Sequence, residues 1–387
     1  MSGSEEGVNY LSELLGAEEW KVREALKRGT IRRVRLSFPD FEYYRLVRDF
    51  SGHERGTIVV PEHDLVVRGF PKIERALLLE PALRHRFGEE GRVIVEEKMN
   101  GHNVRVFEVE GEIYAATRGG LICPYTTHRV RERYGEALRA FFEDHPDAVV
   151  CAEFVGRENP YVSKGYPEAP DVGLFVFDVR DLDGRFWSFR EREAVDEYGL
   201  SRVRCFGEFS VDEAVEEIPR IIRRLDREGR EGVVIKDPER RLGPLKYTTH
   251  AAHVEELEWA FTFAFDLGRD FVLTRTIREG FQSFEWGEDE EELRSRAEDV
   301  GRAIVEGLRR ALERARRGEG AVEEVPLTFA SMRWYRRYEE FVKRLTGGTH
   351  SVEVVNRDED GRVRAVLRKR YVRTEDKLRQ LLREGVL

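Results

Sequence analysis

The stretch RVIVEEKMNGHNVR, residues 92–105, joins a strand pattern to a lysine at the strand's end. Val93 and Val95 alternate with other residues, as in a half-buried β-strand, and Gly101 closes the turn after Lys98. Only 10 of the 66 basic side chains are lysines, and the other 56 are arginines. Because a lysine amine can become a nucleophile near neutral pH and an arginine cannot, Lys98 is a candidate for chemistry.

Two other lysines also end strand-like runs: Lys236 in EGVVIK and Lys246 in GPLKYTT. A lysine attacks a phosphate only as the neutral amine, although the reference pKa is about 10.4. Neighbouring lysines and a divalent metal would lower that pKa and later neutralise charge on the phosphate and the leaving pyrophosphate. By itself, a lysine three residues before a glycine is more typical of a surface turn, so the hypothesis depends on the surrounding residues.

Polar and aromatic side chains near Lys98 suit a nucleotide. Asn103 follows on the outgoing strand and Arg118 ends the predicted return strand, so a hairpin could direct an amide and a guanidinium at sugar and phosphate. Glu153 ends the apolar run VVCAEFVG, where it could accept hydrogen bonds from a ribose or form a structural ion pair. Phe175 and Phe177 share one face of FVFDV, and either could stack on a base or belong to the core.

The run EGVVIK contains a conflict. In an ideal strand, Glu231 and Lys236 lie on opposite faces, so one of them must sit at a bend or an end if both serve the site. Val234 could close the side of a base opposite a phenylalanine.

Composition excludes some classes of protein. The net charge is −9 and charged residues make up 36% of the chain, mixed in sign, which predicts an ion-paired surface and neither supports nor excludes a nucleic-acid groove. Cys123, Cys151 and Cys205 lack the spacing of a zinc ribbon or a disulfide framework. With no apolar run as long as a membrane span, we expect a soluble cytoplasmic protein without a membrane partner.

The periodicity predicts an α+β fold. It indicates a small α+β N-terminal module with one helix over residues 8–28, then packed antiparallel sheets and helices, then a mainly helical C-terminal region. Hairpins are predicted at Glu110-Gly111 and Asp360-Gly361, and helices over residues 211–228 and 329–345. Residues 293–311 carry an apolar stripe, which suits either a dimer interface or packing within the chain. His250 and His253 are expected to be structural. The expected domains are 1–66 (N-terminal), 67–250 (catalytic), 251–318 (helical, dimerisation) and 319–387 (C-terminal, mainly helical).

In this order, the strings KMNGHN, AEFVG, LFVFDV, EGVVIK and LKYTT resemble the motifs of covalent nucleotidyltransferases, which include polynucleotide ligases and messenger RNA capping enzymes. The strings VRGFPKI, TRGGLICPYTT and ENPYV resemble the archaeal homodimeric ATP-dependent RNA ligases over nearly the whole chain. The resemblance implies a ligase-type catalytic domain that lacks the OB-fold of DNA ligases and capping enzymes, since helical periodicity follows Lys246.

The resemblance also implies a mechanism. Lys98 would take AMP from ATP with Mg²⁺ or Mn²⁺, pass it to an RNA 5'-phosphate, and a 3'-hydroxyl would displace it, with circularisation of single-stranded RNA as the expected outcome. Lys98, Lys236, Lys246 and Glu231 would be catalytic, and Glu231 and Glu153 would be the metal candidates. The implied nucleotide-binding residues are Glu97, Lys98, Met99, Asn103, Arg118, Glu153, Phe177, Phe175, Val234, Lys236 and Lys246.

Two positions depart from the resembled motifs. Asn100 stands where many relatives have Asp, and Thr248 stands where a second lysine often follows Lys246. Arg118 or another arginine could compensate for Thr248. A DNA ligase, a capping-type guanylyltransferase and a non-catalytic RNA-binding dimer remain alternatives.

Overall fold

The computed structural model describes residues 5–386 and divides the chain into two compact units. The range expected to form one catalytic domain, 67–250, contributes to both. Unit 1 comprises the chain up to Lys72 together with Gly101–Arg202 and Val325–Leu367, and unit 2 comprises Ile73–Asn100, Val203–Glu324 and the chain from Arg368 onward.

Unit 1 is centred on an antiparallel sheet with the strand order β10-β9-β7-β8. Its hairpin turns at Glu110 and Gly111, as the sequence predicts, and both residues have positive φ angles, 50° and 78°. A β-bulge interrupts the pairing of β9 with β10 between Val176 and Asp178. The strands are β7 (His102–Val109), β8 (Glu112–Thr117), β9 (Ala148–Val155) and β10 (Gly173–Asp181).

Both faces of this central sheet are covered. Val104, Ala152 and Leu174 belong to a core cluster that includes side chains of the helix α4 and of the C-terminal segment. Phe107 and Val149 face the other way, into a cluster with the N-terminal sheet. Alternating strand positions therefore form two cores. The helices that accompany this sheet are α4 (Pro124–Asp144), α5 (Phe189–Arg192) and the 3₁₀ helix η2 (Glu193–Tyr198).

The N-terminal module contains two helices where one was expected over residues 8–28. Gly16 has a φ of +55°, which most residues avoid, so the chain breaks there between the two helices. A strand at residues 43–46 was also not predicted. The elements are α1 (Glu5–Leu14), α2 (Glu19–Lys27), β1 (Ile31–Val34), β2 (Tyr43–Leu46), β3 (Ile58–Val60), the 3₁₀ helix η1 (Pro61–His63) and β4 (Leu65–Val67), with the sheet order β1-β2-β3-β4.

A second small sheet, of order β14-β16-β15, lies in the C-terminal segment and packs with the helix α10. Tyr335, Tyr338 and Phe341 line the buried side of that helix. The hairpin at Asp360-Gly361 and the helix were predicted, but the strand before them was not. The bounds are β14 (Val322–Phe329), α10 (Met332–Thr346), β15 (His350–Arg357) and β16 (Val363–Arg370).

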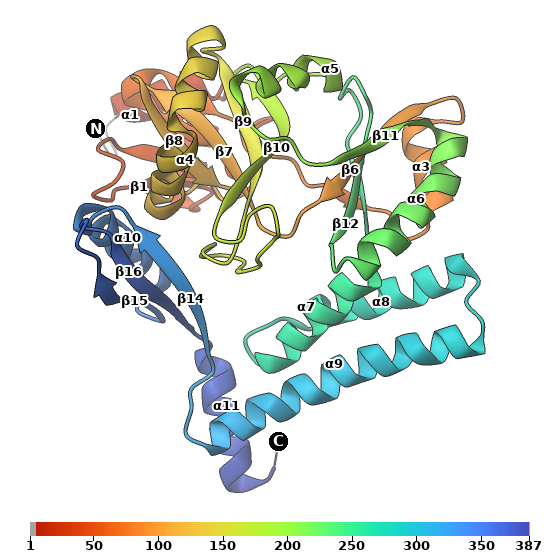
Figure 1. Cartoon of the computed structure of the whole chain (residues 1–387). Helices are drawn as coiled ribbons and strands as arrows, with labels where there is room; N and C mark the ends of the chain where they lie inside the picture. The colour runs from red at the N-terminus through yellow and green to blue at the C-terminus, as the bar shows by residue number, and fades with distance from the viewer. Residues whose placement is uncertain (1–4, 387) are drawn as a thin grey trace. The chain divides into compact units, whose positions relative to one another are not determined.

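Unit 2 contains a five-stranded sheet of order β11-β6-β12-β13-β5, and the helices α3 and α6 cover one of its faces (Figure 1). The buried residues Val93, Val95, Val233 and Ile235 form that core with the apolar side of α6. Residues 92–98 of the stretch RVIVEEKMNGHNVR therefore form an interior strand of this sheet, and residues 102–105 begin β7 of unit 1. The elements are β5 (Glu74–Arg75), α3 (Leu79–Phe87), β6 (Arg92–Lys98), β11 (Cys205–Ser210), α6 (Val211–Arg227), β12 (Gly232–Lys236) and β13 (Leu245–Thr248).

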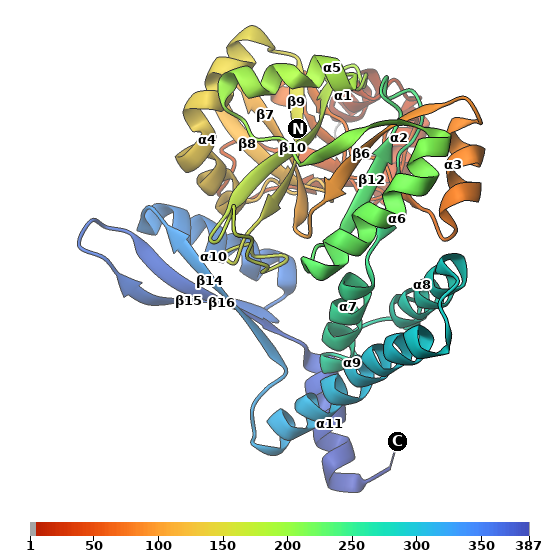
Figure 2. The ribbon, with the colours of Figure 1, turned by 45° about the vertical axis from the view of Figure 1, so that its right-hand side comes forward.

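In the part of the chain that the structure describes, helices and not a closed barrel follow β13 (Figure 2). Of the predicted apolar stripe on α9, Ala311 is buried and Val300, Ile304 and Leu308 are half-buried, whereas Leu293 and Ala297 are exposed. The stripe thus divides between packing within the chain and open surface. The helices are α7 (His250–Thr262), α8 (Arg269–Trp286), which was not predicted, α9 (Glu290–Arg316) and α11 (Val372–Glu384).

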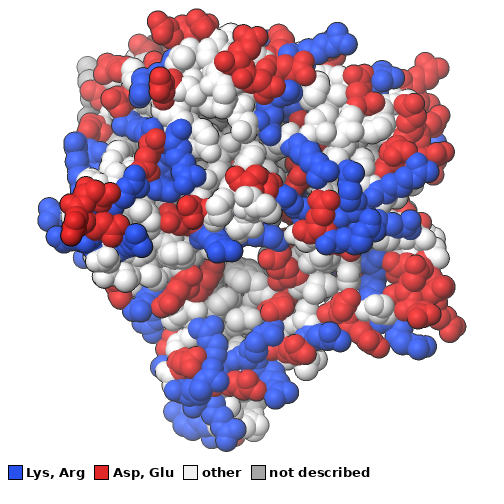
Figure 3. Space-filling view, viewed as in Figure 1, with Lys and Arg blue, Asp and Glu red and all other residues white. Residues whose placement is uncertain are grey.

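The mixed α+β fold class is confirmed, with several antiparallel sheets and helices. Acidic and basic side chains are interspersed over the face in view in Figure 3. Many are paired, as where Arg84 contacts both Glu80 and Asp212 at 2.9 Å. None of the helices within residues 5–386 has the length and apolar character that a membrane span requires.

Candidate active site

Lys98 lies on the face of the unit 2 sheet opposite α3 and α6. In the register of this sheet, Lys98 is opposite Gly232, Val234 is opposite Lys246, and Lys246 is opposite Arg75. Lys236 is opposite Ile94, four residues before Lys98. Because directly opposed residues point to the same side of a sheet, strand pairing places all three predicted lysines on one face. The half-buried Val234 lies between Lys98 and Lys246 on this face.

Glu231 reaches Lys98. The Lys98 Nζ atom lies 2.8 Å from Glu231 Oε2, with the two side chains 21% and 11% exposed. Gly232, the next residue, has a φ of +145°, and a Cβ there would lie 2.3 Å from the carbonyl oxygen of Tyr247. This glycine-only conformation lies at the boundary of β12, so Glu231 escapes strict alternation and can share the site with Lys236. The structure thus resolves the conflict in EGVVIK.

Lys236 is paired with Glu96, a carboxylate that is not among the predicted site residues. Lys236 Nζ lies 2.7 Å from Glu96 Oε2, and both side chains are almost completely buried. Glu96 stands two residues before Lys98 and therefore on the same face of β6. A charged residue inside the run VIVEEK was the signal that could have identified it, since a buried carboxylate requires a partner.

Lys246 lies among cations. Burial, followed by the neighbouring Arg75 and Lys98, lowers the pKa of Lys246 to about 8, whereas Glu231 opposes the shift. Arg278 of α8 adds another positive charge beside Lys246. A group of half-buried cations with few carboxylates is suited to a multiply charged anion such as a phosphate chain.

Glu97 and Met99, two predicted nucleotide-binding residues next to Lys98, do not share its position on the site face of the sheet. Glu97 points to the opposite face, where its Oε1 lies 3.1 Å from Arg230 Nη1. Met99 is buried.

Unit 1 carries the second group of predicted residues. Asn103 and Phe175 are both directly opposite Glu153 in the central sheet, so the three side chains share one face. Glu153 Oε1 accepts a hydrogen bond from the Gly101 backbone N–H at 3.1 Å. The Asn103 Oδ1 atom is buried without a hydrogen-bond partner among the described residues, which leaves an acceptor for a ligand.

Arg118 and Phe177 are also in unit 1. Burial and the nearby Arg55 lower the pKa of Arg118, whereas Glu153 raises it. Phe177 occupies the bulge of β10 and packs edge-to-face on Phe70, with ring centres 5.2 Å apart. It is half-buried, as is Phe175. The structure therefore gathers Lys98, Glu231 and Lys246 in unit 2, and Asn103, Glu153 and Phe175 in unit 1.

The two histidines of HAAH bind a carboxylate of α8. His250 Nδ1 lies 2.5 Å from Glu279, and His253 Nδ1 contacts the other oxygen of the same carboxylate. Arg296 of α9 donates to Glu279 at 2.6 Å. These contacts join α7, α8 and α9 next to the site.

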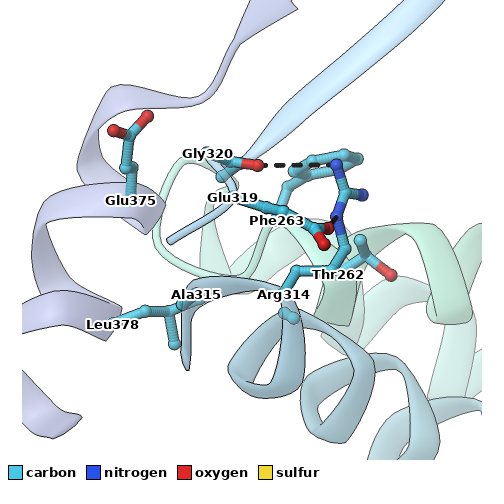
Figure 4. A pocket seen from close by; sticks show the side chains of 10 residues that line it. Thr262, Phe263, Arg314, Ala315, Glu319, Gly320, Glu375 and Leu378 are labelled. Atoms are coloured by element: carbon cyan, nitrogen blue, oxygen red, sulfur yellow. Dashed lines mark hydrogen bonds and ion pairs between the residues drawn. The ribbon is translucent and has the colours of Figure 1, made fainter. Parts of the chain in front are cut away.

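Neither of two other hollows suits a nucleotide. The cavity in Figure 4 measures about 10 Å³, which is room for no more than a water, and Arg314 and Glu319 lie at its rim. A groove of about 450 Å³ in unit 1 is lined by Asp147, Asp181 and Asp183, whose charges would repel phosphates.

Known proteins share this architecture. A sequence model described as RNA ligase matches residues 91–248, and one described as the C-terminal region of the Pab1020 ligase matches residues 259–385. An uncharacterized protein of Methanocaldococcus jannaschii is 33% identical over 380 residues, which are 96% of this chain and 94% of that protein. Solved structures of an archaeal ATP-dependent RNA ligase, forms 1 and 2, are 37% and 38% identical with TM-scores of 0.90 and 0.89. In both cases the match covers 98% of this chain and 99% of the other.

This chain belongs to the archaeal ATP-dependent RNA ligase family. The resemblance found in the motifs is thereby confirmed over nearly the whole chain. A structure from Aquifex aeolicus, named as a candidate ATP-dependent DNA ligase, is 29% identical with a TM-score of 0.86, covering 96% of this chain and 100% of that one. The RNA ligase family thus shares its fold with a protein that is named as a DNA ligase.

Proposed function

We propose that this chain joins RNA 5'-phosphate and 3'-hydroxyl ends at the expense of ATP, with Lys98 as the nucleophile. The observation that carries the proposal is the arrangement of Lys98 beside Glu231 and Lys246 on one face of the sheet, in a chain of the RNA ligase family. A neutral amine, a nearby carboxylate and a group of cations are the parts that attack on phosphorus requires.

In the first step, Lys98 becomes a lysyl-AMP. The ammonium loses one proton, for which the Glu231 carboxylate 2.8 Å away is the acceptor that relays it to solvent. The amine lone pair then forms the N–P bond to the α-phosphate, the bond from that phosphorus to the bridging oxygen breaks, and pyrophosphate leaves with the electron pair. The new adduct loses a second proton by the same route. Lys246 stabilises the charge that develops.

The next two steps regenerate the amine. An oxygen of the RNA 5'-phosphate attacks the phosphorus of lysyl-AMP, the N–P bond breaks, and the nitrogen takes back a proton. An RNA 3'-hydroxyl then loses its proton and attacks the 5'-phosphorus of the RNA-adenylate, and AMP leaves. The unit 1 residues would hold the adenosine, with Asn103 Oδ1 and Glu153 as acceptors for ribose hydroxyls and Phe175 or Phe177 against the base.

A divalent metal fits this site only in part. Among the residues that the structure describes, no three His, Cys, Asp or Glu side chains are grouped to hold one. Magnesium is, however, commonly bound by one or two carboxylates together with substrate phosphates. Glu231, or Glu153 as the other candidate from the sequence, would hold Mg²⁺ or Mn²⁺, which would supply positive charge to the phosphate oxygens when bound.

The proposal is tested with ATP labelled at the α-phosphate. After incubation with a divalent metal and denaturation, we expect label on the wild-type protein and none on Lys98→Ala. Lys98→Arg is the matched control, because it keeps the charge and much of the volume but cannot act as a nucleophile. Undiminished label on either variant would remove Lys98 from the mechanism. Label from GTP instead of ATP would indicate a capping-type enzyme, and no label at all a binding protein.

DNA ligation is the second candidate function, because of the similarity to the Aquifex aeolicus structure. A pre-adenylylated RNA strand offered with a pre-adenylylated DNA competitor separates the two candidates. Preferential sealing of DNA would overturn RNA as the substrate. Closed circles among the products, which resist exonuclease, would establish circularisation.

We further propose a cytoplasmic homodimer. The outer side of α8 exposes Leu273, Ile277, Phe281 and Phe284, at helical steps of four, four and three. Leu293 of α9 is also apolar and exposed. We propose this face of α8 as the dimer surface, in place of the 293–311 stripe, which is partly buried within the chain. Light scattering measures the mass in solution: twice the 45.1 kDa of one chain supports a dimer, and the mass of one chain refutes it.

A further inference from the structure

Arg75 contacts the position at which the chain departs from the resembled motifs. Its Nη1 atom lies 2.5 Å from Oγ1 of Thr248, the residue that stands where a second lysine often follows Lys246. Arg75 is also the strand partner of Lys246, in the parallel pairing of β5 with β13. A guanidinium from a distant part of the sequence is thus held beside the place of the missing ammonium.

The hydrogen bonds that hold Arg75 have a defined direction. A guanidinium only donates, so Thr248 Oγ1 accepts from Arg75 and its hydroxyl proton is free to donate to His253 Nε2, 2.6 Å away. His253 Nε2 is then an acceptor, and the Nδ1–H donates to Glu279. Burial lowers the pKa of His253, in agreement with this neutral form. The chain from Arg75 to Glu279 therefore has one consistent arrangement of protons.

The far end of this hydrogen-bond chain is fixed. Glu279 is buried and also binds His250 and Arg296. Gln282, one turn further along α8, donates to the Thr248 carbonyl at 3.0 Å. Thr248 is therefore held on both its side chain and its backbone, and it can hold Arg75 in one orientation.

The surroundings of Arg75 carry excess positive charge. A small cavity is lined by Arg75, Thr248, His253 and Arg278, and the Arg278 Nε atom is buried without a hydrogen-bond partner among the described residues. Burial lowers the pKa of both arginines to about 10, together with repulsion of Arg75 by Arg278 and of Arg278 by Arg275, and Glu256 and Glu231 offset this only in part. A cluster with this excess of positive charge would be stabilised by the negative charge of a ligand at its edge.

The position of the Arg75 guanidinium in the sheet indicates which phosphates it would contact. Lys98 lies on β6, whereas Thr248, which the guanidinium contacts, lies on β13, two strands away in the order β6-β12-β13-β5. In phosphoryl transfer, the leaving group departs roughly in line with the attacking atom and on the opposite side of the phosphorus. A cation held two strands away from the nucleophile is thus placed for the phosphates beyond the α-phosphate.

We propose that Arg75 binds the β- and γ-phosphates of the nucleoside triphosphate and the pyrophosphate that leaves, and that Thr248, His253 and Glu279 position it. This inference rests on the proposed function, because it requires that Lys98 is adenylylated. Arg75 thereby takes over the role of the lysine that Thr248 replaces.

The test separates the steps that involve pyrophosphate from the step that does not. In Arg75→Gln, we expect adenylylation at low ATP concentration to fall about 10- to 100-fold, the range for loss of a charged hydrogen bond. We also expect that a roughly tenfold higher pyrophosphate concentration is needed to remove AMP from the adenylylated enzyme. Joining of pre-adenylylated RNA without ATP should stay within about twofold of wild type, because no pyrophosphate takes part. A merely structural role would impair all three reactions equally, and that result, or no change in any, would overturn the proposal.

Two further variants keep the test decisive if Arg75→Gln does not fold, as judged by its thermal unfolding. Thr248→Val removes only the hydroxyl, and we expect a smaller rise in the KM for ATP with joining of pre-adenylylated RNA unchanged. Thr248→Lys, combined with Arg75→Gln, returns a cation to the motif position and should restore part of the adenylylation. An unchanged KM in Thr248→Val would overturn the positioning role. A wild-type protein that takes no label from ATP would instead refute the proposed function itself.

Discussion

Lys246 illustrates how a single side chain acquires its properties from its neighbours. Its β-strand leaves it largely buried, and Arg75 and Lys98 are close, so its pKa falls to about 8. The sequence identified Lys246 as a candidate, but it could not provide this value, because Arg75 comes from a segment 171 positions earlier in the numbering. The charge of this lysine therefore changes within a range of pH that experiments can reach.

The affinity for ATP should consequently depend on pH. Lys246 is charged below pH 8 and neutral above it, so binding of the triphosphate should weaken as the pH rises through about 8. An ATP analogue with a methylene group between the α- and β-phosphates allows the Kd to be measured without reaction. Between pH 7.5 and 9.5, we expect the Kd of wild type to rise by up to about tenfold per pH unit. Lys246→Arg, which stays charged, should show little of this rise, and an equal rise in both proteins would refute the role of Lys246.

At the level of helices, α9 is closely packed at one glycine and open at another. Gly307 approaches α7 closely, since a Cβ at this position would lie 2.8 Å from the carbonyl oxygen of Glu258. Gly301 lies two turns earlier on the same helix, and a Cβ there would meet nothing within 4 Å. The two glycines therefore distinguish a packed position from an open one.

Alanine substitutions at these two glycines should have opposite effects on stability. Gly301→Ala should raise the free energy of unfolding by up to about 1 kcal/mol, because alanine favours the helix. In Gly307→Ala, overpacking that costs roughly 1–3 kcal/mol should exceed this gain and lower the free energy of unfolding. Urea unfolding measures both. If Gly307→Ala were as stabilising as Gly301→Ala, α9 would not pack against α7 as described.

In the folded molecule as a whole, contacts between distant segments create sensitivity to acid. His128 of α4 is buried and its Nε2 accepts a hydrogen bond from the Ala330 backbone N–H at 3.0 Å, 202 residues later in the chain. Burial and the neighbouring Arg129 lower the pKa of His128 to about 3. Protonation would remove the acceptor and place a charge in the core of unit 1.

The free energy of unfolding should therefore fall in acid. Because the unfolded histidine, with a pKa of about 6.5, binds a proton before the folded one does, stability is lost as the pH decreases from about 6.5 towards 3. At pH 5, the loss from His128 should be about 2 kcal/mol relative to pH 7.5. His128→Gln keeps an acceptor for Ala330 without titrating, so its urea unfolding should show a smaller loss. The exposed His85→Gln serves as control and should retain the full pH dependence.

The sequence by itself determined the features that depend on local pattern. Alternation around Lys98 predicted β6 and its turn, Glu110-Gly111 predicted the hairpin, and the apolar side of residues 211–228 predicted α6. The motifs also indicated the RNA ligase family that the comparisons confirm. Such features could be predicted because strand and helix periods and turn residues are encoded within a few neighbouring positions.

Only the tertiary structure decided which side chains meet. The two-residue strand β5 has no sequence signal of its own, yet its parallel pairing with β13 places Arg75 beside Lys246 and Thr248. Glu96 acquires Lys236 as its partner through the register of β6 with β12, and His253 acquires Glu279 through the packing of α7 on the unpredicted α8. Electrostatic contacts between segments far apart in the chain leave no periodic trace in the sequence, because each partner is an ordinary polar residue until folding brings it next to the other.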